Sequence, residues 1–132
     1  MAADQKGFVD DTSIPDTSEL WRRIPPRHFY ADDNESGMRP SSAAFEDDPD
    51  GGPLSVFLAA EALAPQHVLE GHEGYALAAL TAGFARANCQ IIARDPRPGP
   101  PGHALVVGRK THGTRKKFAR QARWVVSPSA GT

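Results

Sequence analysis

Residues 103–126 read H-A-L-V-V-G-R-K-T-H-G-T-R-K-K-F-A-R-Q-A-R-W-V-V, and this stretch decides the fold that we expect for the chain. Ala104 to Val107 form an apolar run that is typical of a buried strand. Gly108 begins a turn rich in Gly and Thr, and a short basic helix follows over about Thr114 to Arg123. Trp124-Val125-Val126 then closes the fold.

The turn and the basic helix together predict a site for phosphate. Backbone N–H groups at a helix start attract anions, and basic side chains neutralise the charges of a nucleic-acid backbone. The residues that we expect to bind phosphate are Arg109, Lys110, Thr111, Thr114, Arg115, Lys116, Lys117, Arg120 and Arg123. Thr114 taken alone also fits the role of a helix N-cap.

The expected helix has two different sides, because successive residues lie about 100° apart around its axis. Phe118 and Ala122 fall on the side that would face the core, so we do not expect Phe118 to stack on bases. Lys116 and Arg120 fall on the opposite side and form a basic stripe. Such a stripe suits nucleic acid or another polyanion, an acidic protein or acidic lipid. It is also what an ordinary solvated helix face looks like.

Charge is divided unevenly along the chain. Residues 94–132 hold nine basic and one acidic side chain, whereas residues 1–50 hold five basic and twelve acidic side chains. This asymmetry indicates an interaction surface at the basic end. The alternative is that the acidic half folds against the basic third and neutralises it.

The length of 132 residues is typical of one domain. We expect a flexible acidic arm over residues 1–18, a single domain over residues 19–126 and a flexible tail over residues 127–132. A lone cysteine, Cys89, excludes an internal disulfide and fits a reducing compartment. The sequence shows neither a secretory signal nor an apolar run of membrane-spanning length, so we expect a soluble cytoplasmic protein without membrane association.

The remaining elements are predicted from apolar patterns and from Gly and Pro breaks. Residues 19–24 predict an edge strand with Trp21 in the core, and residues 30–40 a polar loop. Two apolar runs, 41–46 and 54–59, predict a β-hairpin. Short and long helices are expected over 65–69 and 75–87. The runs 89–93 and 103–108 predict strands of a broad hairpin.

Three further residues are candidates for catalysis. Arg39 precedes Pro40-Ser41-Ser42, a segment that suits an anion or a nucleotide phosphate, although Arg39 also has acidic residues around it in sequence to pair with. His103 begins the apolar strand and His112 lies in the basic turn, where a general acid or base would flank an anion site. The alternative for His103 is an ordinary strand-edge histidine. No histidines or cysteines have the spacing of zinc ligands, so we expect neither a metal nor a cofactor.

Three short stretches occur in an order that resembles compact NAD-consuming folds of the ADP-ribosyltransferase and RES type. They are Leu20-Trp21-Arg22-Arg23, Arg39-Pro40-Ser41-Ser42 and Ser55-Val56-Phe57-Leu58-Ala59. The resemblance implies an enzyme that acts on a nucleotide. This chain departs from that pattern because it lacks a late catalytic glutamate: its last three glutamates are Glu61, Glu70 and Glu73.

Taken together, the sequence predicts a small α+β domain with a short, mainly antiparallel sheet packed by two helices. We expect a non-catalytic protein whose basic C-terminal helix binds nucleic acid or another polyanion. The alternatives are an enzyme directed at a nucleotide or phosphoester, with Arg39, His103 and His112 near the reaction, and a subunit of a protein assembly. The sequence leaves the oligomeric state open.

Overall fold

The computed structural model describes residues 7–32, 37–48 and 52–128. It contains one six-stranded sheet in the order β6-β7-β4-β1-β5-β8, in which every neighbouring pair is antiparallel. These strands are β1 (Glu19–Ile24), β4 (Leu54–Leu58), β5 (Ala76–Thr81), β6 (Ile91–Arg94), β7 (His103–Val107) and β8 (Arg123–Val126). The expected small α+β domain with a mainly antiparallel sheet is confirmed.

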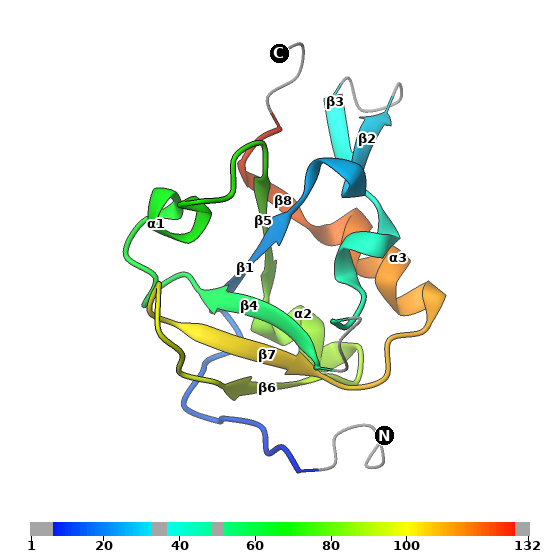
Figure 1. Cartoon of the computed structure of the whole chain (residues 1–132). Coiled ribbons are helices and arrows are strands. Elements are labelled where there is room, and N and C mark those ends of the chain that lie inside the picture. Colours follow the sequence, from blue (N-terminus) through cyan, green and yellow to red (C-terminus); the bar gives the residue numbers. More distant parts are fainter. Residues whose placement is uncertain (1–6, 33–36, 49–51, 129–132) are drawn as a thin grey trace.

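Helices cover both faces of this sheet (Figure 1). On one face Phe45 and Phe118 pack edge to face, with ring centroids 6.1 Å apart, in a core cluster that the strands line. On the other face Val68 packs with Trp21 and Phe57. The helices are α1 (Pro65–Leu69), α2 (Ala82–Ala87), α3 (His112–Gln121) and the 3₁₀ helices η2 (Pro26–His28) and η3 (Ser42–Phe45).

The sheet is open along part of its middle. β1 pairs with β4 only at Leu20↔Leu58 and Trp21↔Phe57, whereas it pairs with β5 along its whole length. β1 is therefore a central strand, and the predicted edge position is wrong. In Figure 1, β4, β7 and β6 run at a steep angle to β5. Because of this angle, β1 and β4 diverge beyond Trp21 and the two halves of the sheet separate there.

Residues 75–87 do not form the single helix that we predicted. Residues Ala76–Thr81 form strand β5, and helix α2 begins only at Ala82, where the Thr81 hydroxyl accepts a hydrogen bond from the Phe84 N–H. β5 is buried on both faces, so its two sides are equally apolar and show no strand-like alternation. Its Ala and Leu residues are also strong helix formers, and this combination misled the prediction.

Two further predictions between residues 29 and 59 are wrong. The expected polar loop over 30–40 contains a second, two-stranded sheet, formed by β2 (Phe29–Asp32) and β3 (Gly37–Pro40). The run 41–46 forms the 3₁₀ helix η3 instead of a strand, so it makes no hairpin with β4. The expected hairpin of residues 89–93 and 103–108 is confirmed as the β6–β7 pair.

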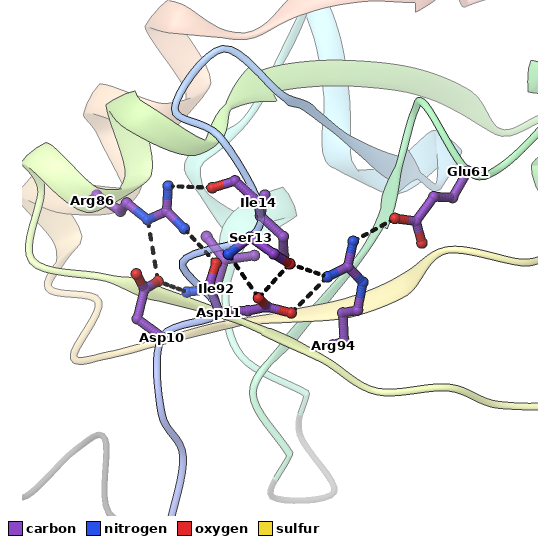
Figure 2. Close-up of polar contacts among 8 residues, drawn as sticks. All are labelled: Asp10, Asp11, Ser13, Ile14, Glu61, Arg86, Ile92 and Arg94. Carbon is purple, nitrogen blue, oxygen red and sulfur yellow. Dashed lines mark hydrogen bonds and ion pairs between the residues drawn. The ribbon is translucent and has the colours of Figure 1, made fainter.

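The acidic residues near the N-terminus pack against the sheet (Figure 2). Asp11 N–H donates to the Ile92 carbonyl of β6, and Ile14 is 2% exposed. Arg86 of α2 binds this segment through Asp10, Asp16 and two backbone carbonyls, and Arg94 binds it through Asp11. This packing differs from the flexible arm that we expected over residues 1–18, of which residues 1–6 lie outside the described part. No described helix is long and apolar enough to cross a membrane.

Candidate functional site

The basic helix α3 begins two residues earlier than predicted. Thr111 is its N-cap: the Thr111 hydroxyl accepts a hydrogen bond from the Thr114 N–H at 3.2 Å and lies 3.1 Å from the Thr114 hydroxyl. Phe118 is fully buried and Ala119 is 8% exposed, which places the apolar side of α3 against the core as expected. The two threonine side chains thus serve the start of the helix.

The Lys110 side chain is buried and bonds to other parts of the chain rather than lying on the surface. Its Nζ lies 2.6 Å from Asp47 Oδ1, 2.8 Å from the Val106 carbonyl and 3.1 Å from the Gly108 carbonyl. The Lys110 side chain is 2% exposed, and this burial lowers the pKa of its amine, while Asp47 opposes that effect. A buried amine with three oxygen partners has little capacity left to bind an external phosphate.

The acidic half of the chain neutralises only part of the basic third. Arg123 forms an ion pair with Glu19, and Arg115 donates to the Lys110 carbonyl. Four exposed basic residues have no acidic partner in the part of the chain that the structure describes. These are Arg109, Lys116, Lys117 and Arg120.

A groove separates α3 from strand β3 and the segment after it. One half, a cavity of about 290 Å³, is lined by Tyr30, Arg39, Pro40, Ser41, Ser42, His112, Lys116, Ala119 and Arg120. The other half, about 380 Å³, shares Arg39, Pro40, Ala119 and Arg120 with the first and continues to Met38, Ala122, Arg123 and Trp124. The two cavities share four lining residues and therefore adjoin each other, and we call them together the β3–α3 groove.

The described residues that line the β3–α3 groove include basic side chains and no acidic ones. His112, Lys116 and Arg120 follow one another at intervals of four residues, so they form a row about 12 Å long on one side of α3. Arg39 lies in the facing wall, beside the hydroxyls of Ser41 and Ser42. No carboxylate lines either half of the groove among the described residues. The arrangement can hold an anionic ligand by charge and by hydroxyl donors.

The three candidate catalytic residues are split between two places. Arg39 and His112 both line the β3–α3 groove, although they are distant in sequence. His103 instead lines a cavity of about 240 Å³ with Arg97 and Phe57. Its Nδ1 lies 2.9 Å from the Asp95 carbonyl and 3.2 Å from Asp95 Oδ2, and its ring is 8% exposed. His103 therefore has the contacts of a buried strand-end histidine.

A second polar cavity lies where β1 and β4 separate. Its volume is about 440 Å³, and Arg22, Arg23, His28, Ser55 and Tyr75 contribute to it. Glu46, Asp47 and Asp48 also line it. Its walls therefore carry both signs of charge, unlike the described residues that line the β3–α3 groove.

Arg22 bridges the open part of the sheet beside this cavity. Its Nε donates to the Ala44 carbonyl and its Nη1 to the Ser55 carbonyl, both at 3.0 Å, while Nη2 makes no hydrogen bond within the described residues. Burial lowers the pKa of the guanidinium to about 10. His28 Nδ1 is buried and also has no hydrogen-bond partner in the described part of the chain.

Comparison with known proteins adds no assignment. No protein-family model, curated protein or solved structure matches the chain. The described residues contain no group of three or more His, Cys, Asp or Glu side chains that could hold a metal ion.

Sequence reasoning missed two residues of these sites. Tyr30, 51% exposed, lines the groove, but it was assigned to a polar loop. The pairs Phe29-Tyr30 and Met38-Arg39 stand on either side of A-D-D-N-E-S-G, whose composition favours a turn, and this sequence pattern could have indicated the β2–β3 hairpin. The sequence did not predict that Arg22 is buried, because charged residues in short strands are usually exposed.

Proposed function

We propose that this protein binds the phosphates of a nucleic acid, or of another polyanion, in the β3–α3 groove. The observation that carries the proposal is the groove lining: Lys116, Arg120 and Arg39 share one depression with hydroxyl groups and with no carboxylate among the described residues. Phosphate oxygens accept hydrogen bonds from all of these groups. The mechanism is neutralisation of phosphate charge, which confers little sequence preference.

The binding surface that we propose is smaller than the one expected from the sequence. Lys110 is buried against Asp47, Arg123 pairs with Glu19, and the Thr111 side chain caps α3. We therefore assign phosphate contacts to Lys116 and Arg120, with His112 and Arg39 as further donors. Ser41 and Ser42 also line this groove. Their sequence segment by itself predicted only a site for an anion or a nucleotide phosphate.

The test compares charge reversals at neighbouring positions of α3. Lys116→Glu and Arg120→Glu change the groove, whereas Lys117→Glu makes the same charge change at an exposed residue outside its lining. Binding of labelled oligonucleotides is measured across a salt series. We expect affinity to fall with salt, and each groove variant to lose about tenfold or more and to reduce the salt slope by about 1.

Lys117→Glu controls for net charge. We expect it to lose less affinity than either groove variant, because its side chain lies outside the groove lining and makes no direct contact with a phosphate bound there. Equal losses in all three variants would show that only overall charge matters. Absence of binding at low salt would refute the proposal.

A specific observation also favours a second function, that of a nucleotide-directed enzyme. Arg22 and Ser55 belong to two of the three stretches that resemble NAD-consuming enzymes, and both line the cavity between β1 and β4. Its mixed charge suits a ligand with phosphates and hydroxyl groups. The experiment is an assay of NAD consumption with the native chain and Arg22→Lys. Turnover that Arg22→Lys abolishes in a folded chain would support the enzyme, and no turnover would exclude NAD as substrate.

Neither remaining alternative receives such support. The enzyme centred on Arg39, His103 and His112 requires the three residues in one pocket, and the structure separates His103 from the others. The assembly subunit requires an exposed apolar patch of several hundred Å², whereas only four large apolar side chains of the described residues are exposed. They are Phe8, Val9, Tyr30 and Leu63.

A further inference from the structure

We infer that the ligand of the β3–α3 groove is a single-stranded nucleic acid, one of whose bases stacks on Tyr30. This inference rests on the proposed function and narrows it from polyanions in general to one class. Three observations carry it: the aromatic ring in the groove, the concave shape of the charged surface and the row of basic residues along it.

Tyr30 is placed to meet a base next to the phosphate site. It pairs with Arg39 across the β2–β3 hairpin, so the two side chains are neighbours on the same face. Both line the same cavity as Lys116 of α3. Tyr30 is 51% exposed, so its ring is accessible to a ligand in the groove.

The shape of the groove favours a single strand over a duplex. The half that contains Tyr30 has a volume of about 290 Å³, which is near the lower limit for small-ligand pockets. The bases of a duplex are stacked inside the helix, and an internal base offers its face to an aromatic side chain only when it is flipped out. A single strand presents its bases freely, and proteins bind it with a basic groove and aromatic platforms.

The groove also has the length for more than one nucleotide. Beyond Arg120 it continues past Met38 to Trp124, whose indole Nε1 donates to the Met38 carbonyl at 2.8 Å. Phe29 packs edge to face against the Trp124 ring, with centroids 6.2 Å apart. These contacts fix Trp124 in the wall, so we expect a strand lying in the groove to alter its fluorescence without stacking on it.

The test separates base stacking from phosphate binding. Four labelled probes are compared on the full chain: oligothymidylate, oligouridylate, a DNA duplex and an abasic single strand that has phosphates but no bases. We expect the duplex and the abasic strand to bind about tenfold more weakly than oligothymidylate. Oligouridylate distinguishes RNA from DNA as the source of the single strand, and tight binding of either supports the inference.

Two variants at one position sharpen this test. Tyr30→Phe retains the ring and should bind like the native chain. Tyr30→Leu should lose about tenfold in affinity for oligothymidylate and nothing for the abasic strand. The exposure of Tyr30 makes both variants compatible with folding, which thermal unfolding checks directly.

The possible outcomes separate the inference from the proposed function. If the abasic strand or the duplex binds as tightly as oligothymidylate and Tyr30→Leu changes nothing, the inference is wrong. If Lys116→Glu still abolishes that binding, the proposed function nevertheless stands. If no probe binds at low salt, both are wrong.

Discussion

Lys110 and Asp47 form an ion pair between the loop before α3 and the loop after η3, with 2.6 Å between Nζ and Oδ1. Asp47 Oδ1 also accepts a hydrogen bond from the Leu54 N–H at the start of β4. The pair therefore joins three segments of the chain. It also removes from the basic surface a lysine that sequence alone placed within it.

Breaking this pair from the acidic side should cost more stability than removing the lysine. Asp47→Asn keeps an acceptor for Leu54 but leaves the buried ammonium without its counter-charge, and we expect a loss of about 1–3 kcal/mol in the free energy of unfolding. Lys110→Met removes the charge itself and should cost less. Urea denaturation measures both. Oligonucleotide binding should be unchanged in Lys110→Met, and a large loss there would return Lys110 to the binding surface.

Two glycines near the start of α3 should respond in opposite directions to alanine. Gly108 has φ +151°, and a Cβ there would lie 2.8 Å from both the Cys89 carbonyl and Gln90 Oε1. We expect Gly108→Ala to destabilise the fold by about 2–4 kcal/mol. Gly113 lies in the helix with only an ordinary contact nearby, so Gly113→Ala should stabilise by about 0.5–1 kcal/mol. Thermal unfolding distinguishes the two, and equal effects would contradict the geometry around Gly108.

The N-terminal segment should depend on Arg86 more than on Arg94 (Figure 2). Arg86 makes four hydrogen bonds to this segment, two of them to backbone carbonyls, and its side chain is 21% exposed. Arg94 makes more exposed pairs with Asp11 and Glu61. We expect Arg86→Ala to lower the free energy of unfolding by about 2–3 kcal/mol and Arg94→Ala to lower it by about 1 kcal/mol or less. Hydrogen exchange at Asp11 and Ile92 should accelerate mainly in Arg86→Ala, and the reverse order would be inconsistent with this packing.

The sequence predicted the outer parts of the fold better than its centre. The β6–β7 hairpin and helix α3 have clear breaks and clear polarity, and both were found. β5 was missed because burial on both faces removes the alternation that identifies a strand. The short run 41–46 also looked like a strand, yet Ala44 and Phe45 reach the core from a 3₁₀ helix. Local pattern cannot decide such cases, since tertiary packing determines them.

The candidate site was predictable only in part for a similar reason. Lys116 and Arg120 could be placed on one side of a helix from their spacing alone. That Arg39 and Tyr30 face them depends on how the β2–β3 hairpin packs beside α3, which no local pattern encodes. The burial of Lys110 depends on Asp47, which lies 63 residues away in the sequence.

The pH dependence of stability should include a contribution from His28. Burial lowers the pKa of its imidazole below 6.5. The positive charges of Arg27 and Arg22 also lower this pKa, whereas the negative charge of Glu46 raises it. The unfolded chain therefore takes up a proton at a higher pH than the folded chain. We expect the free energy of unfolding to fall as pH decreases below about 6.5, with no contribution from His28 above that pH.

His28→Gln isolates this contribution from that of the other titrating groups. Urea denaturation of both chains at about pH 7.5 and about pH 5 should show a smaller loss of stability for the variant. An equal loss in the two chains would mean that His28 titrates as it does in the unfolded state.

The most direct test of the β3–α3 groove is a titration of ¹⁵N-labelled protein with oligothymidylate, followed by amide chemical shifts. We expect the shifts to concentrate in residues 37–39, in the serines that follow Pro40 and along α3 from His112 to Gln121, together with the Trp124 indole N–H. Amides around Arg22 and Ser55 should stay unchanged. Shifts confined to the cavity between β1 and β4, or no shifts at all, would contradict the assignment of the groove as the binding surface.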